Sequence, residues 1–135
     1  MGEDAAARRY SLPREERLRR KRLIRLLFER GAPVRVASLR LLYHRVPEAL
    51  PAPVQVLFSV SSRSIRLAVR RNRIRRLMRE AYRKNKYILL DSISPGTGGL
   101  LLAIQYFGNT LPAYRDVEKN LVACMQKIAE RLCTS

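Results

Sequence analysis

The residues best suited to chemistry in this chain are arginines, and they are concentrated in residues 68–86, AVRRNRIRRLMREAYRKNK. On a helix, residues at i, i+3, i+4 and i+7 share one face. The apolar residues with that spacing are Ile74, Leu77, Met78 and Ala81. The opposite side collects Asn72, Arg75, Arg76, Arg79, Arg83 and Lys86, flanked by Arg71 and Arg73. The spacing therefore predicts a helix that packs one face on a core and presents a second face of guanidinium groups.

A face of this kind suits a polyanion. A guanidinium group binds phosphate oxygens in pairs and can stack on bases, whereas the lysine ammonium acts as a point charge. Eighteen helical residues, Val69 to Lys86, span roughly 27 Å, which is enough to follow several phosphates. Asn72 offers both donors and an acceptor, so it suits a base edge or a 2′-hydroxyl.

A solvated, charged surface is the alternative explanation for these arginines. Such surfaces usually mix both signs of charge, because mixed charges keep a protein soluble without strong repulsion. From Arg63 to Lys86 the chain has 11 Lys and Arg residues and one acid, Glu80. This excess favours nucleic-acid binding and adds Arg63 and Arg66 to the candidate contacts.

The chain offers little for catalysis by its own side chains. A hydrolase needs a nucleophile with a base, paired carboxylates or a metal cluster. Here His44 is the single histidine and the acids are scattered. Residues 91–99, DSISPGTGG, lack the lysine and hydroxyl residue that end a phosphate-binding loop. We therefore expect no catalytic residue and no metal site in the protein itself.

Composition indicates a folded domain with a polyanionic partner. The 135 residues suffice for one domain with a single core. With 47% hydrophobic residues and a net charge of +17, the chain is too apolar for a disordered tail and too basic for an ordinary enzyme. The partner is then nucleic acid or, as the weaker alternative, an anionic membrane surface.

The sequence features that bear on localisation favour the cytoplasm. No segment approaches the ~20 apolar residues of a membrane span, and the N-terminus lacks the apolar core of a secretory signal. Cys124 and Cys133 lie nine residues apart on one predicted helix, hence roughly 13 Å apart, which is too far for a disulfide. Reduced cysteines suit the cytoplasm.

The order of the predicted helices and strands indicates an α+β sandwich. Residues 1–12 show no period and are expected to be mobile, and residues 13–135 form one domain. The expected elements are a helix from Pro13 to Arg30, strand over 34–46 with a break near Ala37, strand over 54–61, the basic helix, strand over 100–107 and a last helix. The order α-β-β-(β)-α-β-α predicts a small sandwich of a mostly antiparallel sheet, with the helices on one side.

The basic stretch resembles a known signature. The run Ala68-Val69, Arg71-Asn72-Arg73, Arg75-Arg76, Arg79-Glu80 and Arg83 is similar to the arginine-asparagine-arginine motif of the protein subunit of bacterial ribonuclease P. The likeness extends to residues 28–31 at the end of the first helix and to residues 58–61 before the basic helix. It covers roughly residues 15 to 130. Ser62-Arg63 and Ile24 depart from the family, which usually has two lysines and a phenylalanine there.

The resemblance implies an accessory role. The catalytic partner would be an RNA that uses Mg²⁺, bound mainly by the RNA, to remove the 5′ leader from precursor tRNA. The protein, a monomer when alone, would bind both RNAs. The contacts implied for the catalytic RNA are Arg63, Arg66, Arg71, Asn72, Arg73, Arg75, Arg76, Arg79 and Arg83. Those implied for a cleft that holds the leader are Phe28, Tyr43, Val56 and Phe58.

Two other functions fit the composition. A ribosomal or other structural RNA-binding protein would share the charge excess, and only the signature favours ribonuclease P over it. A DNA-binding protein with the basic helix in the major groove is a third possibility. The chain lacks helix-turn-helix spacing and a dimerisation heptad, which argues against DNA.

Overall fold

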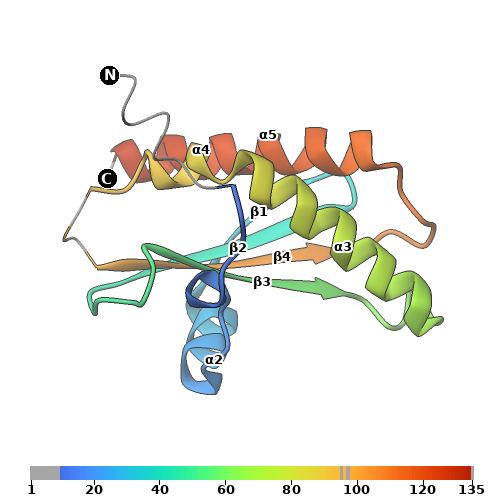
Figure 1. The fold of residues 1–135 in the computed structure, drawn as a ribbon, viewed down its shortest axis with the longest axis horizontal. Helices are drawn as coiled ribbons and strands as arrows, with labels where there is room; N and C mark the ends of the chain where they lie inside the picture. Colours follow the sequence, from blue (N-terminus) through green and yellow to red (C-terminus); the bar gives the residue numbers. More distant parts are fainter. Residues whose placement is uncertain (1–9, 95, 97, 135) are drawn as a thin grey trace.

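The basic stretch forms the helix that its periodicity predicts. The computed structural model describes residues 10–94, 96 and 98–134, and in it this helix is α3, Ala68–Asn85. The remaining helices are η1 (Arg14–Glu16, a 3-10 turn), α2 (Lys21–Arg30), α4 (Tyr87–Leu90) and α5 (Tyr114–Thr134). The strands are β1 (Ala32–Val36), β2 (Leu39–Val46), β3 (Val54–Val60) and β4 (Gly99–Tyr106) (Figure 1).

The strands form one sheet in the order β1-β2-β4-β3. β1 pairs with β2 and β2 with β4 in antiparallel fashion, whereas β3 runs parallel to β4. The chain turns between β1 and β2 at Ala37, whose φ is 53°. The break predicted near Ala37 is therefore confirmed. All eight residues of β4 are buried, as expected of a central strand with a nearly continuous apolar sequence. The predicted α+β sandwich with a mostly antiparallel sheet is confirmed.

The helices cover both faces of the sheet. α3 and α5 lie on one face and α2 lies on the other (Figure 1). The larger core joins α3 and α5 to the sheet, and the smaller one packs Leu23 and Leu27 of α2 on Leu42 and Leu101. The prediction that the helices share one side is therefore wrong. Neighbouring residues of β2 and β4 are both apolar, so each face of the central strands needs a cover.

The first helix is shorter than predicted. Residues 14–16 form η1, residues 17–20 are extended, and α2 begins at Lys21 rather than at Pro13. Arg17 pairs with Val56 at the edge of the sheet, and the Leu18 amide donates to the Val56 carbonyl at 2.9 Å. An edge strand presents unpaired backbone groups, so pairing competes with helix formation here. Gly31 follows α2 as its C-cap, as the sequence predicts.

Residues 10–19, named here the N-terminal strap, lie across the C-terminal end of α3. Residues 1–9 of the expected mobile segment fall outside the described residues. Tyr10, Ser11 and Leu12, the rest of that segment, contact the folded domain: Leu12 packs on the larger core, and the carbonyl oxygens of Tyr10 and Ser11 accept hydrogen bonds from α3 and the residue after it. The ring of Tyr10 meets that of Tyr87 edge to face at 5.4 Å.

Cys124 is buried, Cys133 is exposed, and both are free thiols. Burial is the main cause of a raised pKa at Cys124, which keeps that thiol protonated near neutral pH. Among the described helices, none combines the length and the apolar character that crossing a bilayer requires.

Candidate nucleic-acid interface

The apolar stripe of α3 anchors the helix as predicted. Ile74, Met78 and Ala81 are fully buried and Leu77 is partly buried against the larger core. Tyr82 is also fully buried, and its ring meets Phe58 edge to face with centroids 6.1 Å apart. The sequence analysis missed Tyr82, although its position four residues after Met78 continues the same stripe. Burial is the first cause of a raised pKa at Tyr82, so its hydroxyl stays neutral.

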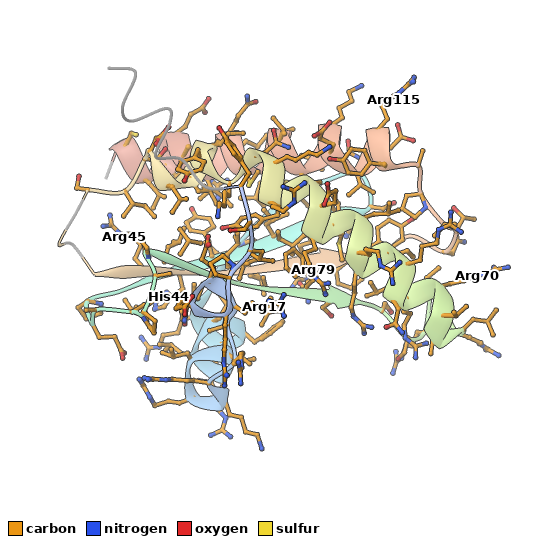
Figure 2. The ribbon with its side chains drawn as sticks, in the orientation of Figure 1. Arg17, His44, Arg45, Arg70, Arg79 and Arg115 are labelled. Carbon is orange, nitrogen blue, oxygen red and sulfur yellow. The ribbon has the colours of Figure 1, made fainter. Side chains whose placement is uncertain are left out.

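The opposite face of α3 is an exposed basic surface. Together with the loop before the helix, it exposes Arg63, Arg66, Arg70, Asn72, Arg73, Arg76 and Arg79, with Arg71 and Arg75 half-buried. Figure 2 shows Arg70 and Arg79 along this helix. Within the described residues, none of these arginines lies within ion-pair distance of a carboxylate. Like charges one turn apart repel each other, so an anionic partner would relieve this face.

Two arginines of this surface also organise it. The Nη1 group of Arg71 donates to the carbonyl oxygens of Ile65 at 2.8 Å and Arg66 at 2.7 Å, which ties the preceding loop to the helix. The Nη1 group of Arg75 donates to Oδ1 of Asn72 at 2.8 Å. The oxygen of Asn72 thus has a partner while its amide N–H groups face solvent, so Asn72 is suited to donate to an incoming acceptor.

The C-terminal end of α3 has different surroundings. Arg83, a predicted RNA contact, donates to both carboxylate oxygens of Glu80 and, at 2.7 Å, to the carbonyl oxygen of Tyr10. Hydrogen bonding from Arg83 is the first cause of a lowered pKa at Glu80. Lys86 is only 2% exposed and holds both carboxylate oxygens of Glu16 at 3.0 Å. Both cations hold the strap to the domain, Lys86 from a buried position and Arg83 from a partly exposed one.

The four residues predicted for a leader cleft do not share one surface. Phe28 is exposed on α2, on one side of the sheet. Tyr43, Val56 and Phe58 pack against the larger core on the other side, and Val56 is only 1% exposed. The cause is strand alternation, because one residue along a strand exchanges faces. Val56 and Phe58 nevertheless line a groove between the strap, β3 and α3.

A polar row crosses the sheet on the α2 side. Leu42 of β2 packs against α2, and Arg40, two residues earlier, points to the same side of the sheet by strand alternation. In the strand register Arg40 lies opposite Arg35 of β1 and Gln105 of β4. The guanidinium carbons of Arg35 and Arg40 lie 5.9 and 5.6 Å from the centre of the Phe107 ring. Nε of Arg40 and Oε1 of Gln105 are buried without a hydrogen-bond partner in the described part of the chain. The exposed Phe107 ring beside two guanidinium groups suits stacking by an unstacked base.

The sequence analysis missed this row. Strand register brings its members together from β1, β2 and β4, and no spacing within one segment reveals register. His44 lies on the same side of β2 as Arg40 and Leu42 by alternation, and it is labelled in Figure 2. Across the described ranges, no three His, Cys, Asp or Glu side chains are close enough to hold a metal ion together. The surfaces present are suited to charge pairing, hydrogen bonding and stacking.

Most of the chain is similar to one known protein family. The family model described as Ribonuclease P matches residues 12–129. A protein named "Ribonuclease P protein component" from Porphyromonas gingivalis is 33% identical over 126 residues, which cover 93% of this chain and 92% of the relative. One of the same name from Chlorobium phaeobacteroides is 37% identical over 129 residues, covering 87% of this chain and 88% of that protein.

Solved structures show the same fold. The ribonuclease P protein from Thermotoga maritima superposes with a TM-score of 0.62 at 19% identity, covering 83% of this chain and 96% of the other. The one from Staphylococcus aureus also gives a TM-score of 0.62, at 16% identity, covering 85% and 95%. The family model matches most of the chain, and relatives share about a third of its residues along nearly their full length. This chain therefore belongs to the ribonuclease P protein family, whose members are components of the enzyme that processes tRNA.

Proposed function

We propose that this protein assists the catalytic RNA of ribonuclease P in removing the 5′ leader of precursor tRNA, and that it binds this RNA through the basic face of α3. The observation that carries the proposal is a row of exposed arginines without carboxylate partners on a helix anchored to the core: Arg73, Arg76 and Arg79. Arg63, Arg66, Arg71, Asn72 and Arg75 extend the same surface. Each phosphate neutralised by such a surface releases counterions, which favours binding at low salt.

The physical task is to bring two polyanions together. The catalytic RNA and the precursor tRNA repel each other, and a protein with a net charge of +17 placed between them lowers that repulsion. The chain would do this without forming or breaking bonds, because its described surfaces offer cations, amides and aromatic rings.

For the 5′ leader we propose the polar row on the α2 side of the sheet. The guanidinium groups of Arg35 and Arg40 lie beside the exposed ring of Phe107, and Phe28 is exposed on α2. Of the residues first predicted for a leader cleft, Phe28 alone lies on this side of the sheet. Single-stranded RNA is suited to this site because its bases are free to stack and to present their edges.

Mg²⁺ belongs to the RNA in this proposal. The described residues offer no carboxylate cluster, and the exposed face of α3 would repel a divalent cation. The metal, when held by RNA phosphates, would supply the phosphodiester chemistry. The free thiols suit a reducing compartment, and we propose that the protein acts in the cytoplasm and is a monomer before it meets the RNA.

Cleavage of a precursor tRNA by the cognate catalytic RNA tests the proposal. At low Mg²⁺ and moderate salt, we expect the wild-type protein to raise the cleavage rate, because it replaces part of the metal's charge screening. Arg73→Ala/Arg76→Ala should lose most of this gain, whereas Arg115→Ala/Lys119→Ala, which removes two exposed cations of α5, should keep it. A protein that bound the RNA and left cleavage unchanged would point to a structural RNA-binding role.

A further inference from the structure

The groove between the strap, β3 and α3 collects guanidinium groups from two distant parts of the sequence. Its volume is about 210 Å³, the space of about seven water molecules at ~30 Å³ each. Arg17 and Arg19 line one side, and Arg75 and Arg79 line the other. Among the described residues, none of those that line the groove is acidic. Figure 2 shows Arg17 and Arg79 beside β3, on the segments that flank it.

The backbone explains why these side chains converge. Residues 17–19 are extended along the edge of β3, so Leu18 points one way and its two neighbours point the other. Leu18 is buried in the smaller core on the α2 side, which directs Arg17 and Arg19 toward the side of α3. On α3, residues four apart share one face, so Arg75 and Arg79 are neighbours.

The strap is held firmly enough to keep this arrangement. The buried pair of Lys86 and Glu16 lies just before Arg17, at 3.0 Å between Nζ and either carboxylate oxygen. Nε2 of Gln55 donates to the carbonyl oxygen of Glu15 at 2.9 Å. The half-buried Phe58 also lines the groove and adds an apolar side chain to its wall. Four cations are thus kept close together without a counter-charge in the groove, although their mutual repulsion opposes this.

We propose that this groove binds one phosphodiester group of an RNA strand, with a guanidinium group from the strap and one from α3 on the same phosphate. Two guanidinium groups can each bind the non-bridging oxygens of one phosphodiester through a pair of N–H···O bonds. The proposal rests on the function proposed above and extends the basic face of α3 across the groove to Arg17 and Arg19 of the strap. The phosphate could come from the catalytic RNA or from the precursor tRNA, and the two sources are separated by the experiment.

The experiment compares three variants of the full chain: Arg17→Gln/Arg19→Gln, Arg75→Gln/Arg79→Gln and the combination of all four. The control is Arg115→Gln/Lys119→Gln, which also removes two exposed cations but lies on α5 (Figure 2). One arm titrates the catalytic RNA alone. The second arm titrates precursor tRNA, with and without its leader, into the assembled protein–RNA complex. Both arms are run over a range of salt concentrations.

We expect each pair to weaken binding about 10-fold or more in one arm, and to lower the slope of log affinity against log salt by roughly 0.7–0.9, the value for one phosphate. Because both pairs act on the same phosphate, the combined variant should lose little more than either pair. The control should change affinity by no more than about twofold. A loss with the catalytic RNA alone assigns the phosphate to that RNA, and a loss that needs the leader assigns it to the precursor tRNA.

Additive losses, with a slope that falls about twice as far in the combined variant, would overturn the shared phosphate. A loss no larger than the control's would show that the groove is merely solvated. In both cases RNA binding by the wild type leaves the function proposed above standing, whereas a wild type that binds neither RNA removes both proposals. Urea unfolding of each variant checks the fold, and Arg17→Gln/Arg79→Gln, with one change per segment, replaces any pair that fails to fold.

Discussion

Residues 70–79 and residues 80–86 are both rich in arginine and lysine, yet their cations have different surroundings. The first segment has six arginines and no acid. Five of these arginines face solvent or the groove beside the strap, and the sixth, Arg71, is hydrogen-bonded to the carbonyl oxygens of the preceding loop. In the second segment Arg83 and Lys84 pair with Glu80, and Lys86 is buried against Glu16. The first segment is arranged to receive charge from another molecule, whereas in the second segment the chain neutralises its own charge.

This difference shows what decides the role of a cation on one continuous helix. Glu80 is a local partner, but Glu16 and the carbonyl oxygens of Tyr10 and Ser11 come from the far end of the chain. An arginine or lysine becomes structural where a distant segment supplies an acceptor, and it stays available to a ligand where none does. The strap supplies acceptors to the second segment and arginines to the first, so it makes the two segments different.

The largest expected effect comes from the buried end. Lys86→Met should lower the free energy of unfolding by about 3–5 kcal/mol, because it leaves the Glu16 carboxylate without its partner in a mostly buried position. Urea unfolding measures the change. Lys84→Met is the matched control, since Lys84 is 51% exposed and 3.8 Å from Glu80, and it should change stability by less than about 0.5 kcal/mol.

Glu16→Gln combined with Lys86→Met should recover part of that loss, because the uncompensated charge is then gone. If Lys86→Met were as stable as Lys84→Met, the pair would not be what holds the strap.

Substitutions in the exposed segment should weaken RNA binding and leave stability nearly unchanged. Arg73→Ala/Arg76→Ala should leave the free energy of unfolding within about 0.5 kcal/mol of wild type, because both side chains are exposed. The same variant should lower affinity for the catalytic RNA and reduce the slope of log affinity against log salt by roughly 1.4–1.8, the value for two phosphates. Anisotropy titrations at several salt concentrations measure it, with Arg115→Ala/Lys119→Ala as the control. A slope equal to the control's would mean that these arginines touch no phosphate.

Much of this contrast is invisible in the sequence, although the helix itself is not. The apolar stripe of Ile74, Leu77, Met78 and Ala81 was predicted from spacing alone, because the period of a helix is a local property. Spacing alone could not show that Arg83 has different surroundings from Arg79. Its surroundings depend on Tyr10, 73 residues earlier, and no pattern within the helix encodes that contact.

The sheet shows the same limit. The strand over residues 54–61 was predicted, but which helix covers each of its faces depends on how the chain returns across the sheet. The row of Arg40 and Gln105 exists only because β2 and β4 pair in one register. Residues 17–20 were predicted as part of a helix, but they are extended in the structure, because pairing with the edge of β3 outweighs their local preference.

Arg83 is the direct test of the boundary between the two segments. Arg83→Ala should reduce the salt slope for the catalytic RNA by less than half of the reduction caused by Arg76→Ala, because the Arg83 guanidinium is already bonded to Glu80 and to the strap. It should also destabilise the fold, though less than Lys86→Met, since Arg83 is partly exposed. Equal reductions of the salt slope for the two variants would mean that the RNA-binding segment extends past Arg83.

The smallest expected effect concerns Glu80 and is set by pH. The pKa of Glu80 is lowered in the folded state, chiefly by the hydrogen bond from Arg83. Its contribution to stability is therefore present above its unfolded pKa and is lost as the pH falls through the folded pKa. Wild type should be slightly more stable than Glu80→Gln at pH 7, and the two should converge as the pH falls through the lowered pKa of Glu80. Urea midpoints at each pH measure the difference, with Glu130→Gln on α5 as the control. Glu80→Gln should also release Arg83 toward solvent, so RNA affinity at pH 7 should rise while stability falls. If affinity instead stayed constant, the carbonyl oxygen of Tyr10 alone would suffice to hold Arg83, and the strap rather than the local acid would mark the end of the RNA-binding face.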